Sequence, residues 1–171
     1  MSMVHIYCGD GKGKTTASVG LAVRAAGCGK KVMFSQFFKD GSSSEISVLR
    51  DLPNVELNIC TKKHPFFFRM TEEEKEKAKC DYRLLFDKAE EAVKNGVDLL
   101  VMDEAVSACN HGMIDEDAVI ELLKNRGETE IVLTGRDPSE ALVNEADYIS
   151  EVRKIKHPFD KGIHARKGIE F

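Results

Sequence analysis

A short run of glycine, lysine and threonine residues near the start of the chain has the spacing of a phosphate-binding loop. It comprises Gly9, Asp10, Gly11, Lys12, Gly13, Lys14, Thr15 and Thr16. Glycines let the backbone N–H groups of such a loop approach phosphate oxygens, Lys14 supplies positive charge, and the Thr15 hydroxyl is a suitable ligand for Mg²⁺. The usual pattern has glycine where this chain has Cys8, and the alternative is a glycine turn with surface lysines. We predict that the run binds the phosphates of a nucleoside triphosphate.

A pair of acidic residues follows an apolar segment later in the chain. Asp103 and Glu104 come directly after residues 98–102, which have the composition of a buried strand. Ligands of an open parallel sheet bind at the carboxyl ends of the strands, so we expect both acids beside the phosphate-binding loop, as in a Walker B element. One carboxylate there can hold Mg²⁺ with Thr15 while its neighbour orients a reacting group. Lys14 and Glu104 are therefore the catalytic candidates, and the alternative is an acid pair that caps a helix.

Arg136 is a further candidate, because it follows the predicted strand of residues 130–133. It would bring a guanidinium to the same edge of the sheet. There it could bind the triphosphate, or it could merely pair with a surface acid. The sequence leaves both interpretations open.

The elements that must position these residues alternate between strands and helices. Helices are predicted at residues 16–26, 71–95 and 115–124, and strands at 3–7, 32–37, 55–59, 98–102, 130–133 and 148–152. The long middle helix starts at a capping box formed by Thr71 and Glu74, and a short helix is expected with Pro138 at its first position. This alternation predicts a single α/β domain over residues 1–171, in which a mostly parallel sheet carries helices on both faces.

The last part of the chain, from Lys156 onward, has neither helical nor strand periodicity. A disordered terminus is one interpretation. Three apolar residues in it, Phe159, Ile163 and Phe171, favour the other interpretation, a tail that packs on the domain.

Composition excludes several classes of function. The net charge is −4 and long basic runs are absent, so nothing favours nucleic acid as a partner. No stretch approaches the ~20 apolar residues of a membrane span, and the first strand begins too early for a signal peptide. The five cysteines contain no C-x-x-C pair, so neither a zinc site nor a disulfide framework is indicated. We expect a cytoplasmic protein with free thiols.

Taken together, these segments resemble the P-loop type of corrinoid adenosyltransferases. The resemblance covers nearly the whole chain. Its most specific part is the C-terminal segment, since the glycine loop by itself is shared by many NTPases. It rests on residues 9–16, 20–27, 36–39, 98–104, 134–136, 156–163 and 167–171.

The resemblance implies a RecA-like P-loop fold and a particular reaction. A Co(I) corrinoid would attack the 5′ carbon of ATP, with Mg²⁺ present, and inorganic triphosphate would leave. Because the reduced cobalt is the nucleophile, the protein would position the substrates and neutralise the leaving group. A reductase or a reduced flavoprotein would supply the electrons, and a homodimer is possible. The alternatives are a small-molecule kinase and an ATPase switch module on the same loop.

The resemblance also gives a second interpretation of Phe66, Phe67 and Phe68, which follow a polar loop. The simpler interpretation is that all three anchor the loop to the core. In the family, aromatic residues two apart help to hold the corrinoid with its lower axial position empty. Phe66 and Phe68 have that spacing, and in an extended segment they would lie on the same side.

Overall fold

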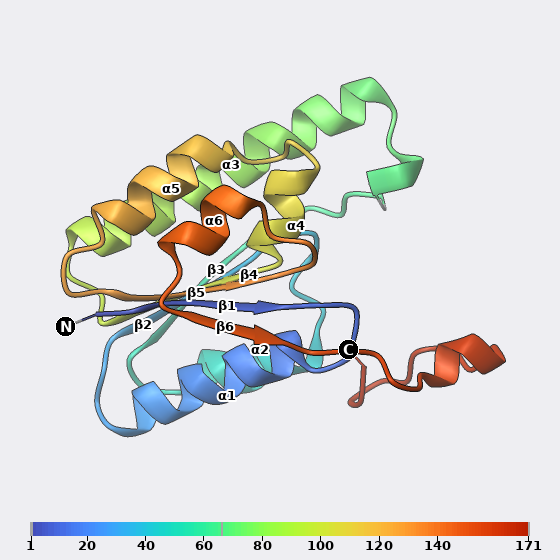
Figure 1. Ribbon diagram of the computed structural model, residues 1–171, viewed down its shortest axis with the longest axis horizontal. Coiled ribbons are helices and arrows are strands. Elements are labelled where there is room, and N and C mark those ends of the chain that lie inside the picture. The colour runs from blue at the N-terminus through green and yellow to red at the C-terminus, as the bar shows by residue number, and fades with distance from the viewer. Residues whose placement is uncertain (1, 66, 171) are drawn as a thin grey trace.

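The computed structural model describes residues 2–65 and 67–170, and its strands and helices alternate along the chain (Figure 1). The strands are β1 (Val4–Cys8), β2 (Val32–Gln36), β3 (Val55–Ile59), β4 (Leu99–Asp103), β5 (Glu130–Thr134) and β6 (Tyr148–Glu151). The helices are α1 (Lys14–Gly27), α2 (Ser44–Asp51), α3 (Glu72–Lys94), α4 (Ala105–Asn110), α5 (Glu116–Lys124) and α6 (Glu140–Glu145), with 3₁₀ turns η1 (Phe67–Arg69) and η2 (Pro158–Lys161).

The strands form one sheet in the order β3-β2-β4-β5-β1-β6, and every pair in it is parallel. The prediction of a mostly parallel sheet is confirmed. Strand β5 lies between β1, which leads into the glycine loop, and β4, which ends in Asp103. Because all six strands run the same way, their carboxyl ends meet at one edge, and Gln36 pairs in register with Asp103 there.

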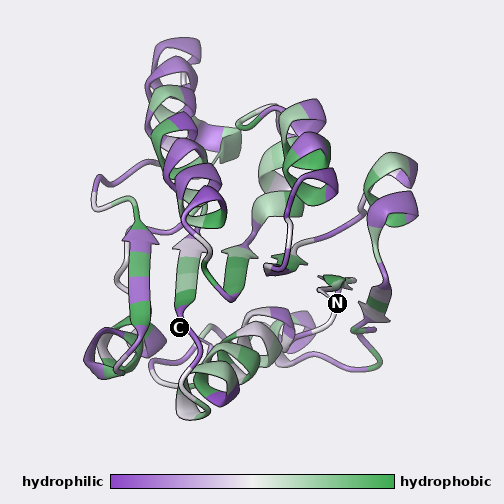
Figure 2. Cartoon of the chain, turned by 90° about the vertical axis from the view of Figure 1, so that its left-hand side faces the viewer, coloured by the Kyte–Doolittle hydropathy of each residue, from purple (hydrophilic) through white to green (hydrophobic). Residues whose placement is uncertain are grey.

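Helices cover both faces of the sheet, as predicted (Figure 1). Helices α1 and α2 pack on one face around Ala22, Ile46 and Leu49. Helices α3, α4, α5 and α6 pack on the other around a larger core that includes Tyr82 and Phe86. Figure 2 shows the apolar strands between these two layers. A strand buried on both faces needs apolar side chains in a row, and β2 and β4 are buried at every position.

Local signals in the sequence placed most element boundaries correctly. The capping box is confirmed, because the Glu74 N–H donates to Thr71 Oγ1 at 3.2 Å and the Thr71 N–H donates to Glu74 Oε2 at 2.8 Å. The prediction for Pro138 is wrong. Helix α6 begins at Glu140, because Ser139 caps it by accepting the Leu142 N–H at 3.2 Å, and this leaves the proline outside the helix. Helices α2 and α4 are additional to the predicted elements.

The tail is held by polar contacts near its two ends and not by apolar packing. Phe159 and Ile163 are exposed, and the segment around η2 projects from the body (Figure 1). The expectation that these two side chains pack on the domain is therefore wrong, and Phe171 lies outside the described residues. Polar contacts hold the chain instead: the Gly11 N–H donates to Val152 O at 2.7 Å just before the tail begins, and Lys12 Nζ lies 3.9 Å from Glu170 Oε1 at its far end.

None of the helices in the part of the chain that the structure describes is long and apolar enough to cross a membrane. All five cysteines are free, as the sequence led us to expect.

Gly135 lies at the carboxyl edge of the sheet, and we expect that a larger residue cannot replace it without loss of stability. Its φ is +151°, and a Cβ would lie 2.7 Å from Val106 Cβ and 2.8 Å from the Ser107 nitrogen. We expect Gly135→Ala to lower the free energy of unfolding by about 1–3 kcal/mol, because α4 would have to move. Denaturant unfolding measures this.

Gly20→Ala is the matched control. Gly20 lies in α1, and a methyl group added to it would have nothing within 4 Å, so alanine should raise the free energy of unfolding by about 0.5–1 kcal/mol. Equal stability of the two variants would contradict the argument from close approach.

Candidate functional site

The glycine loop between β1 and α1 is seated against the chain that leaves β6. Gly9 and Gly13 have φ values of +103° and +129°, which side chains rarely adopt. A Cβ on Gly11 would lie 2.7 Å from Val152 O, the same oxygen that accepts the Gly11 N–H. The glycines therefore serve both the turn and its close contact with the β6 extension.

The first turn of α1 is left available to an anion. Among the described residues no side chain caps this helix, and its first turn contains no acidic residue. Helices α2 and α4 also have no side-chain cap in the described chain, whereas α3, α5 and α6 begin at capping residues whose side chains accept backbone N–H groups. Unpaired N–H groups and the positive end of the helix dipole together favour a phosphate.

A cleft of about 640 Å³ lies over this loop, and we call it the loop cleft. Lys14, Lys39, Arg136 and Glu104 line it, together with Asp10, Gly11, Lys12, Gly13, Thr15, Thr16 and residues of α2 and the tail. It brings together most of the residues predicted to bind a nucleotide. Four basic side chains, Lys12, Lys14, Lys39 and Arg136, could bind a polyanion there, beside four acidic side chains that also line the cleft.

Lys14 is only 8% exposed, and its Nζ donates to Gly11 O at 2.9 Å. Burial lowers its pKa from the ordinary lysine value, and the nearby Arg136 guanidinium lowers it further. Two cations that face one cleft repel each other, so an anion bound between them would be stabilised by both. Among the described residues Arg136 has no ion pair, which favours the phosphate-binding interpretation over the surface pair.

Asp103 is fully buried, and four neighbours satisfy its carboxylate. Its Oδ1 accepts from Thr15 Oγ1 at 2.9 Å and from Thr134 Oγ1 at 2.7 Å. Its Oδ2 accepts from Gln36 Nε2 and from Lys39 Nζ, both at 3.1 Å. The sequence did not predict Lys39 as a site residue, although a lysine three residues beyond a buried strand is a signal that could have been used.

Glu104 makes contacts different from those of Asp103. It has a left-handed φ of +61°, and its Oε2 accepts from Ser107 Oγ at 2.6 Å. Its backbone N–H donates to Thr134 Oγ1 at 2.9 Å, which fixes the turn into α4. Asp103 is thus held inside the sheet edge, and Glu104 lies in the loop cleft.

Two loop residues make structural contacts. Asp10 Oδ1 accepts the Lys154 N–H at 2.8 Å, and this hydrogen bond holds the pKa of the carboxyl below its ordinary value. Lys12 faces Glu170 of the tail. Their side chains therefore tie the tail to the loop, and both residues also line the loop cleft.

A second cleft, of about 570 Å³, adjoins the first, and we call it the aromatic cleft. Lys39 and Glu170 line both clefts. Its walls include the rings of Phe38, Phe67, Phe68, Tyr82 and His111, with 4.3 Å between the centroids of Phe67 and His111, beside charged and hydroxyl side chains. Such a surface suits a large ligand with apolar faces.

The structure corrects the expectation for the phenylalanine run. Residues 67–69 form a 3₁₀ turn and not an extended segment. Phe67 packs against the core, whereas Phe68 is 88% exposed and lines the aromatic cleft. The anchoring interpretation thus holds for Phe67 and is wrong for Phe68. Phe66 lies outside the described residues.

The sheet order, the glycine loop and the buried aspartate define a P-loop NTPase domain of the RecA-like type. Two solved structures share this fold. The EssC protein of Geobacillus thermodenitrificans (ATPases 2 and 3) aligns with a TM-score of 0.54 and 14% identity, covering 98% of this chain and 35% of that one. The EccC protein of Thermomonospora curvata (ATPases 2 and 3) gives a TM-score of 0.55 and 19% identity, covering 92% and 32%.

Sequence comparison identifies the family. A model of the ATP:corrinoid adenosyltransferases BtuR/CobO/CobP matches residues 1–171, so the chain belongs to that family. The corrinoid adenosyltransferase of Pseudomonas aeruginosa is 31% identical over 97% of this chain and 82% of its own length. The corrinoid adenosyltransferase CobA of Salmonella typhimurium is 31% identical over 99% of this chain and 85% of its own length.

We expect Lys39 and Asp103 to stabilise the fold as a pair. Lys39→Met leaves a buried carboxylate without its cation and should lower the free energy of unfolding by about 1–3 kcal/mol, since the lysine is 30% exposed and its pair is partly screened. In Lys39→Met/Asp103→Asn the two effects should not add, with a coupling of about 1 kcal/mol or more in a double-mutant cycle.

The control for this cycle is Lys30→Met, an exposed lysine after α1, which should change stability by less than about 0.5 kcal/mol. Strict additivity of the Lys39 and Asp103 changes would show that the pair does not interact.

Proposed function

We propose that this chain transfers the 5′-deoxyadenosyl group of ATP to the Co(I) centre of a corrinoid and releases triphosphate. Membership of the family supports the reaction. The observation that carries the residue assignment is the pair of adjoining clefts, one polar and built on the glycine loop, the other aromatic, with Lys39 and Glu170 in the wall of both. ATP in one cleft and a corrinoid in the other would meet at that wall.

The chemistry needs little from the protein except geometry and charge. The electron pair of Co(I) forms a bond to the ATP 5′ carbon, the carbon–oxygen bond breaks, and its electrons leave with the triphosphate. Cobalt is formally oxidised to Co(III) as the carbon is transferred. A protein can lower the barrier by aligning the two centres and by stabilising the charge that develops on the leaving oxygen.

Lys14, Arg136 and the N-terminus of α1 are assigned to the leaving triphosphate. Their positions in the loop cleft support this role. The Arg136 charge also lowers the pKa of Lys14, which indicates that the two cations lie near each other. Backbone N–H groups of residues 9–16, apart from that of Gly11, which donates to Val152 O, would hold the remaining phosphate oxygens. These groups are fixed before the reaction, so their reorganisation adds little to the barrier.

Mg²⁺ fits the donor atoms beside Asp103, and Thr15, Asp103 and Glu104 are the residues that would hold it. All three offer hard oxygen atoms. Gln36 Oε1, next to them, is buried without a hydrogen-bond partner in the described part of the chain, so an acceptor remains for an ion or its water. When bound, Mg²⁺ would neutralise phosphate charge. Lys39, whose Nζ lies 3.5 Å from Thr15 Oγ1, would add a second positive charge beside the phosphates.

The aromatic cleft is assigned to the corrinoid, with Phe68 and Phe66 against its lower face. There they would exclude water and the lower axial ligand, which makes Co(II) easier to reduce. The electron would come from a reductase or a reduced flavoprotein. We place the enzyme in the reducing cytoplasm, where its free thiols are stable, and the exposed edge strand β6 is available to a second copy in a homodimer.

Product analysis tests the reaction directly. With ATP and chemically reduced cobalamin, the wild-type protein should release one triphosphate per adenosylated corrinoid. A kinase would release ADP with a phosphorylated acceptor, and an ATPase would release ADP and phosphate. Lys14→Ala should lower turnover by about 10²–10³ without changing the melting temperature greatly, because it removes charge from the leaving group.

Lys30→Ala is the control for Lys14→Ala, since it removes an exposed lysine at the far end of α1. It should leave turnover unchanged. Near-normal turnover of a folded Lys14→Ala protein would reject the assignment of Lys14.

The aromatic assignment predicts a difference between two assays. Phe68→Ala should slow adenosylation that starts from Co(II) corrinoid far more than adenosylation of pre-reduced Co(I), with little loss of stability because the ring is exposed. Phe66→Ala should behave alike. Phe159→Ala, an exposed phenylalanine of the tail, serves as the control. If both assays slow equally, Phe68 does not act on the reduction.

A further inference from the structure

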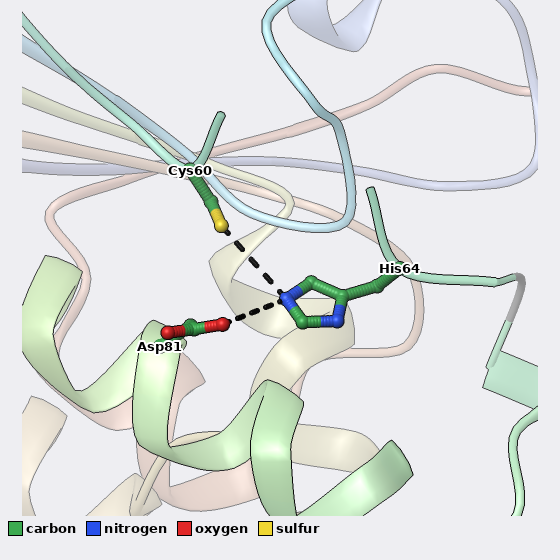
Figure 3. Close-up of side chains that lie close together, drawn as sticks. All are labelled: Cys60, His64 and Asp81. Carbon is green, nitrogen blue, oxygen red and sulfur yellow. Dashed lines mark hydrogen bonds and ion pairs between the residues drawn. The ribbon is translucent and has the colours of Figure 1, made fainter. Parts of the chain in front are cut away.

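Three side chains with metal-binding chemistry lie close together (Figure 3), and one of them, His64, lines the aromatic cleft. Cys60 directly follows β3, His64 lies four residues later, and Asp81 comes from α3. Cys60 is 8% exposed, and the side chains of His64 and Asp81 are 12% and 11% exposed. Their sulfur, nitrogen and oxygen ligand atoms all lie within 4.8 Å of one another.

The two contacts of the histidine converge on one ring nitrogen. Cys60 Sγ lies 3.8 Å from His64 Nε2, and Asp81 Oδ2 lies 3.1 Å from the same atom (Figure 3). A Cys–His–Asp catalytic relay would need the carboxylate on one ring nitrogen and the thiol on the other. Here three atoms with lone pairs surround one point, which is the arrangement that a shared cation requires.

We propose that Cys60, His64 and Asp81 bind a Zn²⁺ ion. Zinc takes thiolate, imidazole and carboxylate ligands, with bonds of about 2.0–2.3 Å in a tetrahedron. Those bonds put sulfur and nitrogen ligands about 3.6 Å apart, and nitrogen and oxygen ligands about 3.4 Å apart. The separations of 3.8 and 3.1 Å are close to these values, and the sulfur and oxygen atoms, which lie within 4.8 Å of each other, would come together to about 3.5 Å around the ion. Water completes the tetrahedron.

Neighbouring groups orient two of the ligands. Lys62 Nζ donates to Asp81 Oδ1, which leaves Oδ2 turned toward the histidine. The Tyr82 ring packs edge-on against His64, with 5.6 Å between centroids. Groups that fix ligands in this way raise metal affinity, because less freedom is lost on binding.

The zinc ion would clip a loop to a helix. Cys60 and His64 belong to the connection between β3 and η1, whereas Asp81 lies within α3. This connection continues into Phe67 and Phe68, and His64 itself lines the aromatic cleft. A clip at this point would hold one wall of the cleft in place. The role is structural and does not depend on which ligand the cleft binds.

Zinc binding by the full-length protein, free of ATP and corrinoid, tests the proposal. After equilibrium dialysis, the wild type should retain one zinc ion per chain. Cys60→Ser, His64→Ala and Asp81→Asn should each weaken binding by about 100-fold or more, beyond the usual effect of an outer-shell change. Cys80→Ser and His164→Ala, which change an exposed cysteine beside Asp81 and an exposed histidine, are the matched controls and should bind as the wild type does.

Two further measurements use the wild type, so they do not depend on how the variants fold. Co²⁺ in place of Zn²⁺ should give a thiolate-to-metal charge-transfer band, and zinc should slow amide hydrogen exchange in residues 60–71 more than in α5. Failure of the wild type to retain zinc would overturn the proposal, as would retention of zinc by all three ligand variants or Co²⁺ binding without the thiolate band. If zinc does not change hydrogen exchange in residues 60–71, the proposal that the ion fixes this loop to α3 is wrong.

Discussion

The carboxylate of Asp103 is the constraint on which the rest of the site depends. A charge removed from water must be compensated, and here the compensation comes from four separate parts of the chain. Thr15 lies in the first turn of α1, Thr134 ends β5, Gln36 ends β2 and Lys39 follows in the next loop. The four groups can satisfy one carboxylate only if the ends of the strands and the glycine loop keep a fixed arrangement. The sheet edge is therefore rigid where the phosphates would bind.

The same interaction sets the boundary between the two clefts. Lys39 reaches Asp103 from the loop after β2, and that loop contains Phe38 with a left-handed φ of +56°. The ring of Phe38 then faces Phe67 and His111 in the aromatic cleft. One loop thus contributes a cation to the polar side and a ring to the apolar side. A reaction between a triphosphate ester and a flat macrocycle needs such a division, because a single uniform surface could not hold both.

The glycine loop is supported from below by the extension of β6. Val152 O accepts the Gly11 N–H, and Asp10 accepts the Lys154 N–H. Neither bond uses the N–H groups at the start of α1. In the described chain no side chain caps these groups, so they are available to a phosphate. The tail after β6 is then anchored at its base, while its middle carries exposed apolar side chains. Near its end the tail comes back to the glycine loop, where Glu170 faces Lys12 and lines one side of both clefts.

The sequence by itself determined what depends on neighbouring residues. Glycine spacing specified the phosphate loop, the Thr71–Glu74 pair specified the start of α3, and apolar segments separated by helical patterns specified a parallel sheet with two helical layers. Tertiary structure alone decided the partners that are distant in sequence. Thr15 and Asp103 are 88 residues apart, and Cys60 reaches Asp81 from another element without the C-x-x-C spacing that marks many zinc sites. A buried carboxylate such as that of Asp103 needs hydrogen-bond or ion-pair partners. No local sequence pattern indicates which distant lysine or threonine the folded sheet places beside it.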